Sequence, residues 1–180
     1  MFDGYRSQYS ARKSLIQVSN KDEVEQINAQ QGLFTWDRAP QKENVESISF
    51  DQFKLSEDRY PFQELKQLWV ISGDSVVYAL ELGKFGLARV RGRLAHTNLT
   101  GGGVAYSGGE LWFMDGSRQL VLNGASGRYR PRSSDEIDCV CEAFSATGFD
   151  VISMGWDEGT NEPRRVLRES HSKLFHAPDR

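Results

Sequence analysis

Between residues 68 and 123, short apolar runs are separated by turn signals, which is a pattern typical of β-hairpins. The turn signal Gly73-Asp74 separates the apolar runs LWVIS and VVYALEL. A second signal, Asp115-Gly116, separates VAYSGGELWFMDG from RQLVLNG. These spacings predict two hairpins. The run LAHTNL at residues 94–99 is interpreted as a further strand that ends at three consecutive glycines. Residues 68–131 should therefore be mostly antiparallel strands.

One helix is indicated by spacing, over residues 134–147. Its apolar residues fall at i, i+3, i+4 and i+7, which makes one stripe along a helix; they are Ile137, Val140, Cys141 and Phe144. Ser133 and Glu136 have capping-box spacing, and Gly148 is a natural helix end. The run FDVISMGW predicts a returning strand. A short helix capped by Ser19 and a last helix containing Val166, Leu167, Leu174 and Phe175 are also predicted.

These elements predict one α+β domain, a mainly antiparallel sheet with a few packed helices. Residues 1–32 would form a polar arm and short helix, 33–155 the core, and 156–180 a charged tail. The polar stretch 39–44 and the segment around Pro61 predict loops.

Charge and composition exclude several classes of protein. The 180 residues include 22 basic and 25 acidic side chains, a net charge of −3, which disfavours general nucleic-acid binding. No apolar run approaches the ~20 residues that span a bilayer, and the N-terminus lacks the apolar segment of a secretory signal. Cys139 and Cys141 are too few for a zinc site and typical of reduced thiols. We therefore expect a cytoplasmic protein without a metal, although leaderless export would leave no trace.

The segment from His96 to Gly116 contains the first candidate site. Three glycines, Gly101, Gly102 and Gly103, follow His96-Thr97, and glycine lets the backbone approach a ligand closely. His96 can donate, accept or titrate near neutral pH. The alternatives are structural: a triple glycine that turns the chain, and a histidine that is hydrogen-bonded in the core.

A second candidate is the segment SGRYRPR, residues 126–132. On an extended strand Arg128, Arg130 and Arg132 share one face, where their guanidinium groups would grip a phosphate or carboxylate. The alternative is a solvated edge strand that ends at Pro131.

These segments resemble a domain of the plant IQ-motif calmodulin-binding proteins of the IQM type, and similar segments of bacterial toxin and effector polyproteins. The family's His-Ser-Ser, Gly-Gly, Ala-Gly-Glu and Ser-Gly-His-Tyr-x-Pro motifs match His96-Thr97-Asn98, Gly101–Gly103, Gly108–Glu110 and Ser126–Pro131. Upstream, LFTWD and FKLSEDRYPF also resemble family segments, so the similarity covers roughly residues 33–155.

This chain departs from the family pattern at two motifs. Thr97-Asn98 replaces the two serines, and Arg128 replaces the second histidine. No IQ motif is present, so calmodulin binding is not expected. The resemblance implies where the site lies more than which reaction it performs.

The first hypothesis is an intracellular effector or toxin-type domain with a ligand or substrate cleft around His96 and Ser126–Tyr129. Its ligand-binding residues would be Thr97, Gly101, Gly102, Gly103, Ser126, Arg128 and Arg130, with Gly101–Gly103 at the rim. One version resembles ADP-ribosyltransferases: His96 would bind the ribose of NAD, Tyr129 would stack on nicotinamide, and Glu158 would stabilise the oxocarbenium-like transition state. Spacing alone selects this version.

The second hypothesis is a non-catalytic protein-binding module, such as an immunity or adaptor protein. Trp112 or Trp156 would then be an exposed anchor for the partner.

Overall fold

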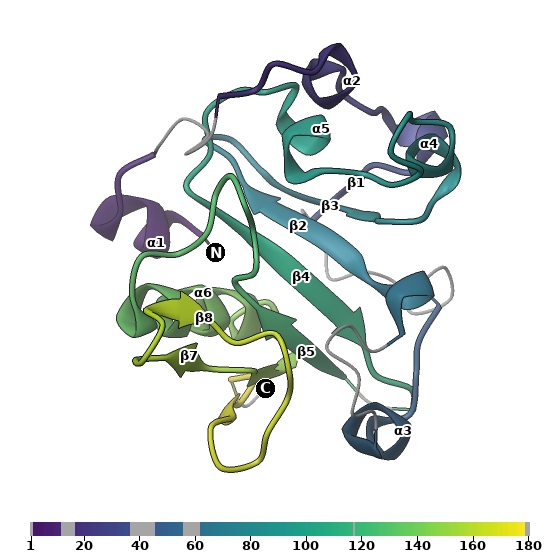
Figure 1. Cartoon of the computed structure of the whole chain (residues 1–180). Helices are drawn as coiled ribbons and strands as arrows, with labels where there is room; N and C mark the ends of the chain where they lie inside the picture. Colours follow the sequence, from purple (N-terminus) through teal and green to yellow (C-terminus); the bar gives the residue numbers. More distant parts are fainter. Residues whose placement is uncertain (1, 12–16, 37–45, 56–61, 117, 179–180) are drawn as a thin grey trace.

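A seven-stranded, mostly antiparallel sheet runs through the computed structural model, which describes residues 2–11, 17–36, 46–55, 62–116 and 118–178 (Figure 1). The strand order is β1-β3-β2-β4-β5-β6-β9. The strands are β1 (Phe34–Thr35), β2 (Gln67–Ile71), β3 (Val76–Leu80), β4 (Ser107–Phe113), β5 (Gln119–Asn123), β6 (Asp150–Ser153) and β9 (Lys173–Phe175). A separate two-stranded sheet pairs β7 (Trp156–Asp157) with β8 (Glu162–Pro163). The α+β fold predicted from the sequence is confirmed.

The helices of the described residues are short, apart from one. They are α1 (Asp3–Gln8), α2 (Lys21–Val24), α3 (Phe50–Leu55), α4 (Lys84–Leu87), α5 (His96–Thr100) and α6 (Ser134–Ser145), with 3-10 turns at Ala29–Gln31 and Gln63–Leu65. No helix among these residues is both long and apolar enough to cross a membrane.

Both predicted hairpins are present. Strands β2 and β3 pair from Gln67↔Leu80 to Ile71↔Val76, and β4 and β5 pair across the turn at Gly116, whose φ is +63°. Strands β5 and β6 run parallel because α6 carries the chain back between them.

Helix α6 covers one face of the sheet with the stripe that the sequence predicts. The Ser133 hydroxyl accepts a hydrogen bond from the Glu136 backbone N–H, and Val140 and Phe144 are fully buried against sheet residues such as Trp69. Helix α1 lies beside α6, where the Tyr5 hydroxyl donates to Glu136 Oε1 at 2.8 Å. The helix ends at Ser145, two residues earlier than predicted.

Two separate clusters cover the opposite face. Leu68 and Val70 of β2 pack with Leu99 of α5, while Trp112 of β4 packs against Phe53 of α3. Side chains alternate between the faces of a strand, so Trp69 and Ile71 point toward α6 instead. The middle of this face lies between the covers formed by α5 and α3 (Figure 1).

The strand predicted for residues 94–99 is wrong, because His96–Thr100 is helix α5. Asn98 caps this helix: its Oδ1 accepts from the Ala95 backbone N–H at 2.8 Å. Gly101 then ends the helix in the left-handed conformation, with a φ of +61°. Such local bonds favour a helical turn over an extended strand.

Two other predicted helices also differ. Helix α2 is capped by Asn20 rather than Ser19, since the Asn20 side chain accepts from the Asp22 N–H. The last predicted helix is instead strand β9, in which Leu174 pairs with Ile152 at the edge of the sheet. The predicted loops at 39–44 and at Pro61 lie outside the described residues.

Candidate functional site

A cleft of about 360 Å³ opens on the sheet face that carries α5. On strand β4, three positions point to this face in succession: Gly108 beneath His96, then Glu110, then Trp112 beneath α3. Glu110 therefore lies between the two covers, and it lines the cleft. The remaining walls come mainly from α2, the loop before α5, the loop after β5, and the segment after β8 that carries Arg165.

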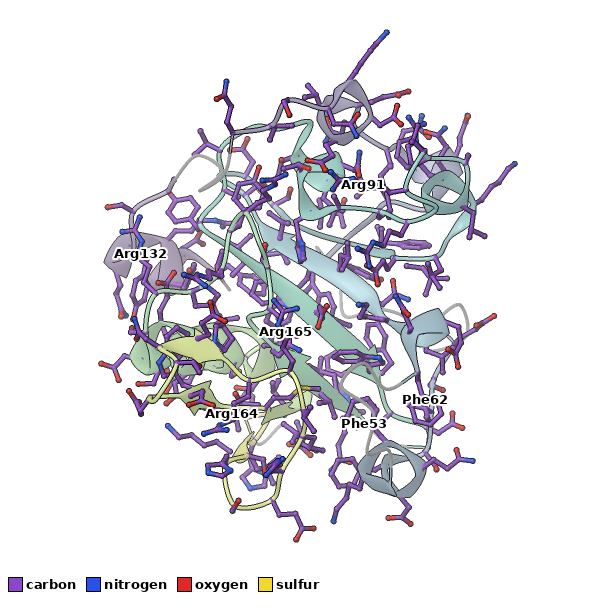
Figure 2. The ribbon with its side chains drawn as sticks, viewed as in Figure 1. Phe53, Phe62, Arg91, Arg132, Arg164 and Arg165 are labelled. Carbon is purple, nitrogen blue, oxygen red and sulfur yellow. The ribbon has the colours of Figure 1, made fainter. Side chains whose placement is uncertain are left out.

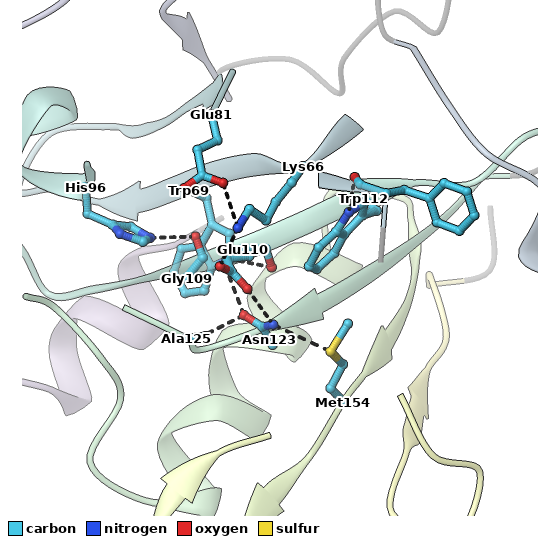
Figure 3. A network of polar contacts seen from close by, with 11 residues as sticks. Lys66, Trp69, Glu81, His96, Gly109, Glu110, Trp112, Asn123, Ala125 and Met154 are labelled. Atoms are coloured by element: carbon cyan, nitrogen blue, oxygen red, sulfur yellow. Dashed lines mark hydrogen bonds and ion pairs between the residues drawn. The ribbon is translucent and has the colours of Figure 1, made fainter. Parts of the chain in front are cut away.

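Three buried charged side chains form the floor of the cleft, and we call them the floor triad: Lys66, Glu81 and Glu110 (Figure 3). The ammonium Nζ of Lys66 lies 2.6 Å from Glu81 Oε2 and 3.0 Å from Glu110 Oε1. Asn123 Nδ2 donates to the other oxygen, Glu110 Oε2, at 3.0 Å. Strand pairing brings these residues together: the Glu81 N–H donates to the Lys66 carbonyl, and Glu110 is opposite Leu68.

The floor triad is costly to bury. Each of its side chains is at most 7% exposed, and removing an ion from water costs several kcal/mol before pairing. Two carboxylates share one ammonium, so the triad has a formal charge of −1. Apolar residues of similar size would commonly serve stability as well or better. A buried charged cluster at a cleft is therefore a candidate functional site.

His96 joins this floor from helix α5. Its Nε2 lies 2.8 Å from the Gly109 carbonyl oxygen, and because a carbonyl can only accept, Nε2 carries the hydrogen. Burial lowers the pKa of His96, opposed by the Gly109 hydrogen bond and the nearby carboxylates. The ring is thus neutral near pH 7, which leaves Nδ1 as a hydrogen-bond acceptor.

Glycine in β4 makes room for this histidine. A Cβ atom on Gly108 would lie 3.3 Å from His96 Cδ2 and 3.1 Å from the Trp69 carbonyl oxygen. The absence of a side chain at Gly108 therefore serves packing between α5 and the sheet. No bulge interrupts the strand, since Gly108 and Gly109 both pair in register with β2.

Arginines dominate the walls. The lining contains six cationic side chains, namely Lys66 and Arg89, Arg91, Arg93, Arg128 and Arg165, against four acidic ones, namely Asp22, Glu23, Glu81 and Glu110. Figure 2 shows Arg165 over the middle of the sheet and Arg91 near α5. In a chain of net charge −3, this local excess of positive charge favours anions.

Several wall arginines are already paired. Glu23 of α2 forms ion pairs with both Arg91 and Arg128, and Arg89 pairs with Glu25. The Arg89 guanidinium also lies 3.8 Å from the centre of the Phe85 ring. Arg93 is exposed and has no ion pair within the described part of the chain.

Of the residues predicted from the sequence, His96 and Arg128 line this cleft. Thr97 is fully buried, and its hydroxyl has no hydrogen-bond partner among the described residues. Ser126 is also buried, and its Oγ accepts from the Tyr129 N–H at 3.0 Å and the Arg128 N–H at 3.3 Å. Ser126 therefore shapes the turn that places Arg128.

Tyr129 and the three glycines lie apart from the cleft lining. The Tyr129 ring is fully enclosed, and its hydroxyl donates to the Gly103 carbonyl at 2.7 Å and lies 2.9 Å from Thr100 Oγ1. Gly101 and Gly102 have positive φ values of +61° and +75° and end helix α5. The sequence expectation that His96 and Tyr129 share a cleft rimmed by Gly101–Gly103 does not describe this cleft.

The three alternating arginines do not share a face, because residues 127–129 form a turn rather than a strand. Arg128 contacts Glu23, Arg130 pairs with Glu162 beside a neighbouring depression, and Arg132 lies toward α1 (Figure 2).

Three further side chains named from the sequence also lie elsewhere. Glu158 is exposed in the turn between β7 and β8 and does not line the cleft. Trp112 and Trp156 are 1% and 8% exposed, so neither is an exposed anchor.

No group of three His, Cys, Asp or Glu side chains in the described ranges could hold a metal ion. The chain matches no family model, no curated protein and no solved structure. The resemblance to the IQM-type domain therefore stays a prediction.

Proposed function

We propose that the cleft binds a small polar molecule with an anionic group, phosphate or carboxylate, as a ligand or substrate. One observation carries this proposal: five arginines and a buried charged floor line the same cleft. Guanidinium groups bind phosphate and carboxylate through paired hydrogen bonds. An effector or toxin-type domain that acts on such a molecule in the cytoplasm is the hypothesis for its biological setting.

The floor complements the arginine walls. Glu81 and Glu110 can accept hydrogen bonds from hydroxyl or amino groups of the ligand, and His96 Nδ1 can accept one more. A neutral histidine and paired carboxylates are also the groups used in general acid–base catalysis. The cleft therefore supports a substrate as well as a ligand.

The ADP-ribosyltransferase version stays a prediction with less support than simple anion binding. It needs the Tyr129 ring to stack on nicotinamide, whereas that ring is fully enclosed. It also needs Glu158, which lies outside the cleft lining. NAD carries a pyrophosphate, so it remains a reasonable ligand to test.

The second candidate function is a non-catalytic protein-binding module, favoured by one observation near the cleft. Leu87 and Val90 are 62% and 88% exposed and flank Arg89. Arginine beside exposed apolar side chains is typical of interfaces. In that case Val90→Asp would abolish partner capture while small-anion binding stayed the same.

A thermal-shift screen followed by calorimetry tests the proposal. The panel contains nucleotides, NAD, sugar phosphates, pyrophosphate and citrate. A ligand at 100 times its dissociation constant stabilises the native state by about 2.7 kcal/mol.

Arg93→Gln is the informative variant, because Arg93 lines the cleft without an ion pair in the described chain and its loss should weaken binding without destabilising the fold. Arg132→Gln, an exposed arginine outside the lining, is the matched control. Absence of binding by the wild type across the whole panel would refute the proposal, and equal affinity in both variants would remove Arg93 from the site.

A further inference from the structure

Glu23 holds a distinctive position in the wall of the cleft. It comes from α2 and is only 4% exposed. Its carboxylate contacts two guanidinium groups from different segments: Arg91, and Arg128 at 2.8 Å from Nη2 to Oε2. Both arginines line the cleft, so a carboxylate of the protein lies where two forked donors converge.

We propose that Arg91 and Arg128 form the subsite for the anionic group of the ligand, and that the Glu23 carboxylate occupies this subsite until the ligand displaces it. The inference rests on the proposed function, which it makes specific to two arginines. Carboxylate and phosphate present the same paired acceptor oxygens to a guanidinium group.

The Arg128–Glu23 pair differs from an ordinary surface ion pair, whereas the Arg91 side chain is 57% exposed. The side chains of Arg130 and Glu162 are 43% and 49% exposed, whereas those of Arg128 and Glu23 are 16% and 5% exposed. Glu23 Oε1 pairs with Arg91 and Oε2 with Arg128, so two guanidinium groups share one carboxylate. A phosphate group, with more acceptor oxygens, would satisfy the two guanidinium groups more completely.

The surroundings allow the side chain of Glu23 to leave while its backbone stays. Asn98 Nδ2 donates to the backbone carbonyls of Asp22 and Glu25, which attaches α2 to α5. The backbone N–H of Ile27 also donates to the Asn98 carbonyl at 3.2 Å. None of these bonds uses the carboxylate of Glu23, so a rotamer change is enough to open the subsite.

An internal competitor raises the apparent dissociation constant, which equals the intrinsic constant divided by the fraction of molecules in which the subsite is free. Removing the charge of Glu23 should therefore tighten anion binding, while removing a guanidinium should weaken it. A purely structural Glu23 predicts the opposite, because its loss would loosen Arg91 and Arg128 and reduce binding.

The experiment is calorimetric titration of the full chain with pyrophosphate and, separately, with citrate. Glu23→Gln is expected to lower the dissociation constant about tenfold and Arg128→Gln to raise it about tenfold. Glu162→Gln and Arg130→Gln repeat the same substitutions in the exposed pair and should change little. The pyrophosphate and citrate arms show whether phosphate or carboxylate is preferred.

Two outcomes overturn the inference differently. If the wild type binds anions and Arg93→Gln weakens binding, but Glu23→Gln binds no more tightly than wild type, only the displacement inference fails. If neither the wild type nor Glu23→Gln binds any anion, the proposed function fails with it. Should Glu23→Gln not fold, the Nε–Hε NMR signal of Arg128 in the wild type must shift on adding pyrophosphate, and an unchanged signal also refutes the inference.

Discussion

Replacing Lys66 by methionine should destabilise the protein strongly, because Lys66 is the only cation of the floor triad. Its Nζ lies 2.6 Å from Glu81 Oε2 and 3.0 Å from Glu110 Oε1. Methionine fills a similar volume but leaves two carboxylates without their ammonium. All three side chains are at most 7% exposed, so water cannot replace the lost partner fully.

The magnitude follows from the cost of an unpaired buried charge. Removing one partner of a buried ion pair typically costs about 3–5 kcal/mol. An exposed pair contributes about 0–1 kcal/mol. Lys173, whose side chain is 55% exposed and pairs with Asp138, therefore supplies the matched control Lys173→Met.

Urea unfolding followed by tryptophan fluorescence measures the effect. With a slope of about 2 kcal/mol/M, Lys66→Met should lower the midpoint by roughly 1.5–2.5 M, while Lys173→Met should lower it by less than about 0.5 M. The triple variant Lys66→Met/Glu81→Gln/Glu110→Gln removes all three charges and should recover much of the loss.

A loss below about 1 kcal/mol for Lys66→Met would refute the reasoning, because it would equal a surface pair. A triple variant no more stable than Lys66→Met would show that the cost comes from packing rather than charge.

Three further predictions concern single side chains. Cys139 is half-buried and should react with thiol reagents well before Cys141, which is fully buried and whose pKa burial raises; equal labelling rates would contradict this. Tyr129→Phe should cost about 0.5–1.5 kcal/mol in a denaturation curve, because its hydrogen bond to the Gly103 carbonyl is lost, while pyrophosphate affinity stays unchanged. The reverse result would return Tyr129 to the site. Burial lowers the pKa of His96, so the unfolded chain takes up the proton at higher pH than the folded protein does. The free energy of unfolding should therefore fall as pH drops below about 6.5. His96→Gln should flatten this dependence of stability on pH, and identical slopes in the variant and the wild type would refute the assignment.

The elements that local sequence patterns specify were predicted well. The turn signals at 73–74 and 115–116 fixed both hairpins, and the stripe that includes Val140 and Phe144 fixed α6. In each case the pattern that predicts the element lies within a few residues of it. Local signals of this kind are the most reliable ones in a sequence.

Helix α5 shows where local reasoning fails. Residues 94–99 alternate enough to resemble a strand, but Asn98 bonds to the Ala95 N–H and to carbonyls of α2. The bonds to α2 join residues more than 70 positions apart, so no window of sequence contains them. The same helix carries His96, and its misassignment hid the direction in which the imidazole points.

The floor triad could not be predicted for a related reason. Lys66 and Glu81 lie next to the ends of β2 and β3, where a charge usually meets solvent, whereas Glu110 lies in the middle of β4. They meet because β2 pairs with both β3 and β4, an order that the sequence does not state. One feature of the sequence could have indicated Glu110: it directly precedes the apolar residues Leu111 and Trp112. All three lie in a strand that is buried along its whole length.

The glycines of β4 contribute to the site because they lack side chains, and not through contacts of their own. At Gly108 a Cβ would crowd the His96 ring, and at Gly109 it would lie 2.1 Å from the Asn123 carbonyl oxygen. Without a side chain at Gly108, α5 can lie close to β4, so that His96 reaches the Gly109 carbonyl beside Glu110. The missing side chain at Gly109 instead lets β4 lie close to β5. Glycine enrichment thus indicated the right part of the chain through packing, while two members of the floor triad, Lys66 and Glu81, come from segments outside the glycine-rich motifs.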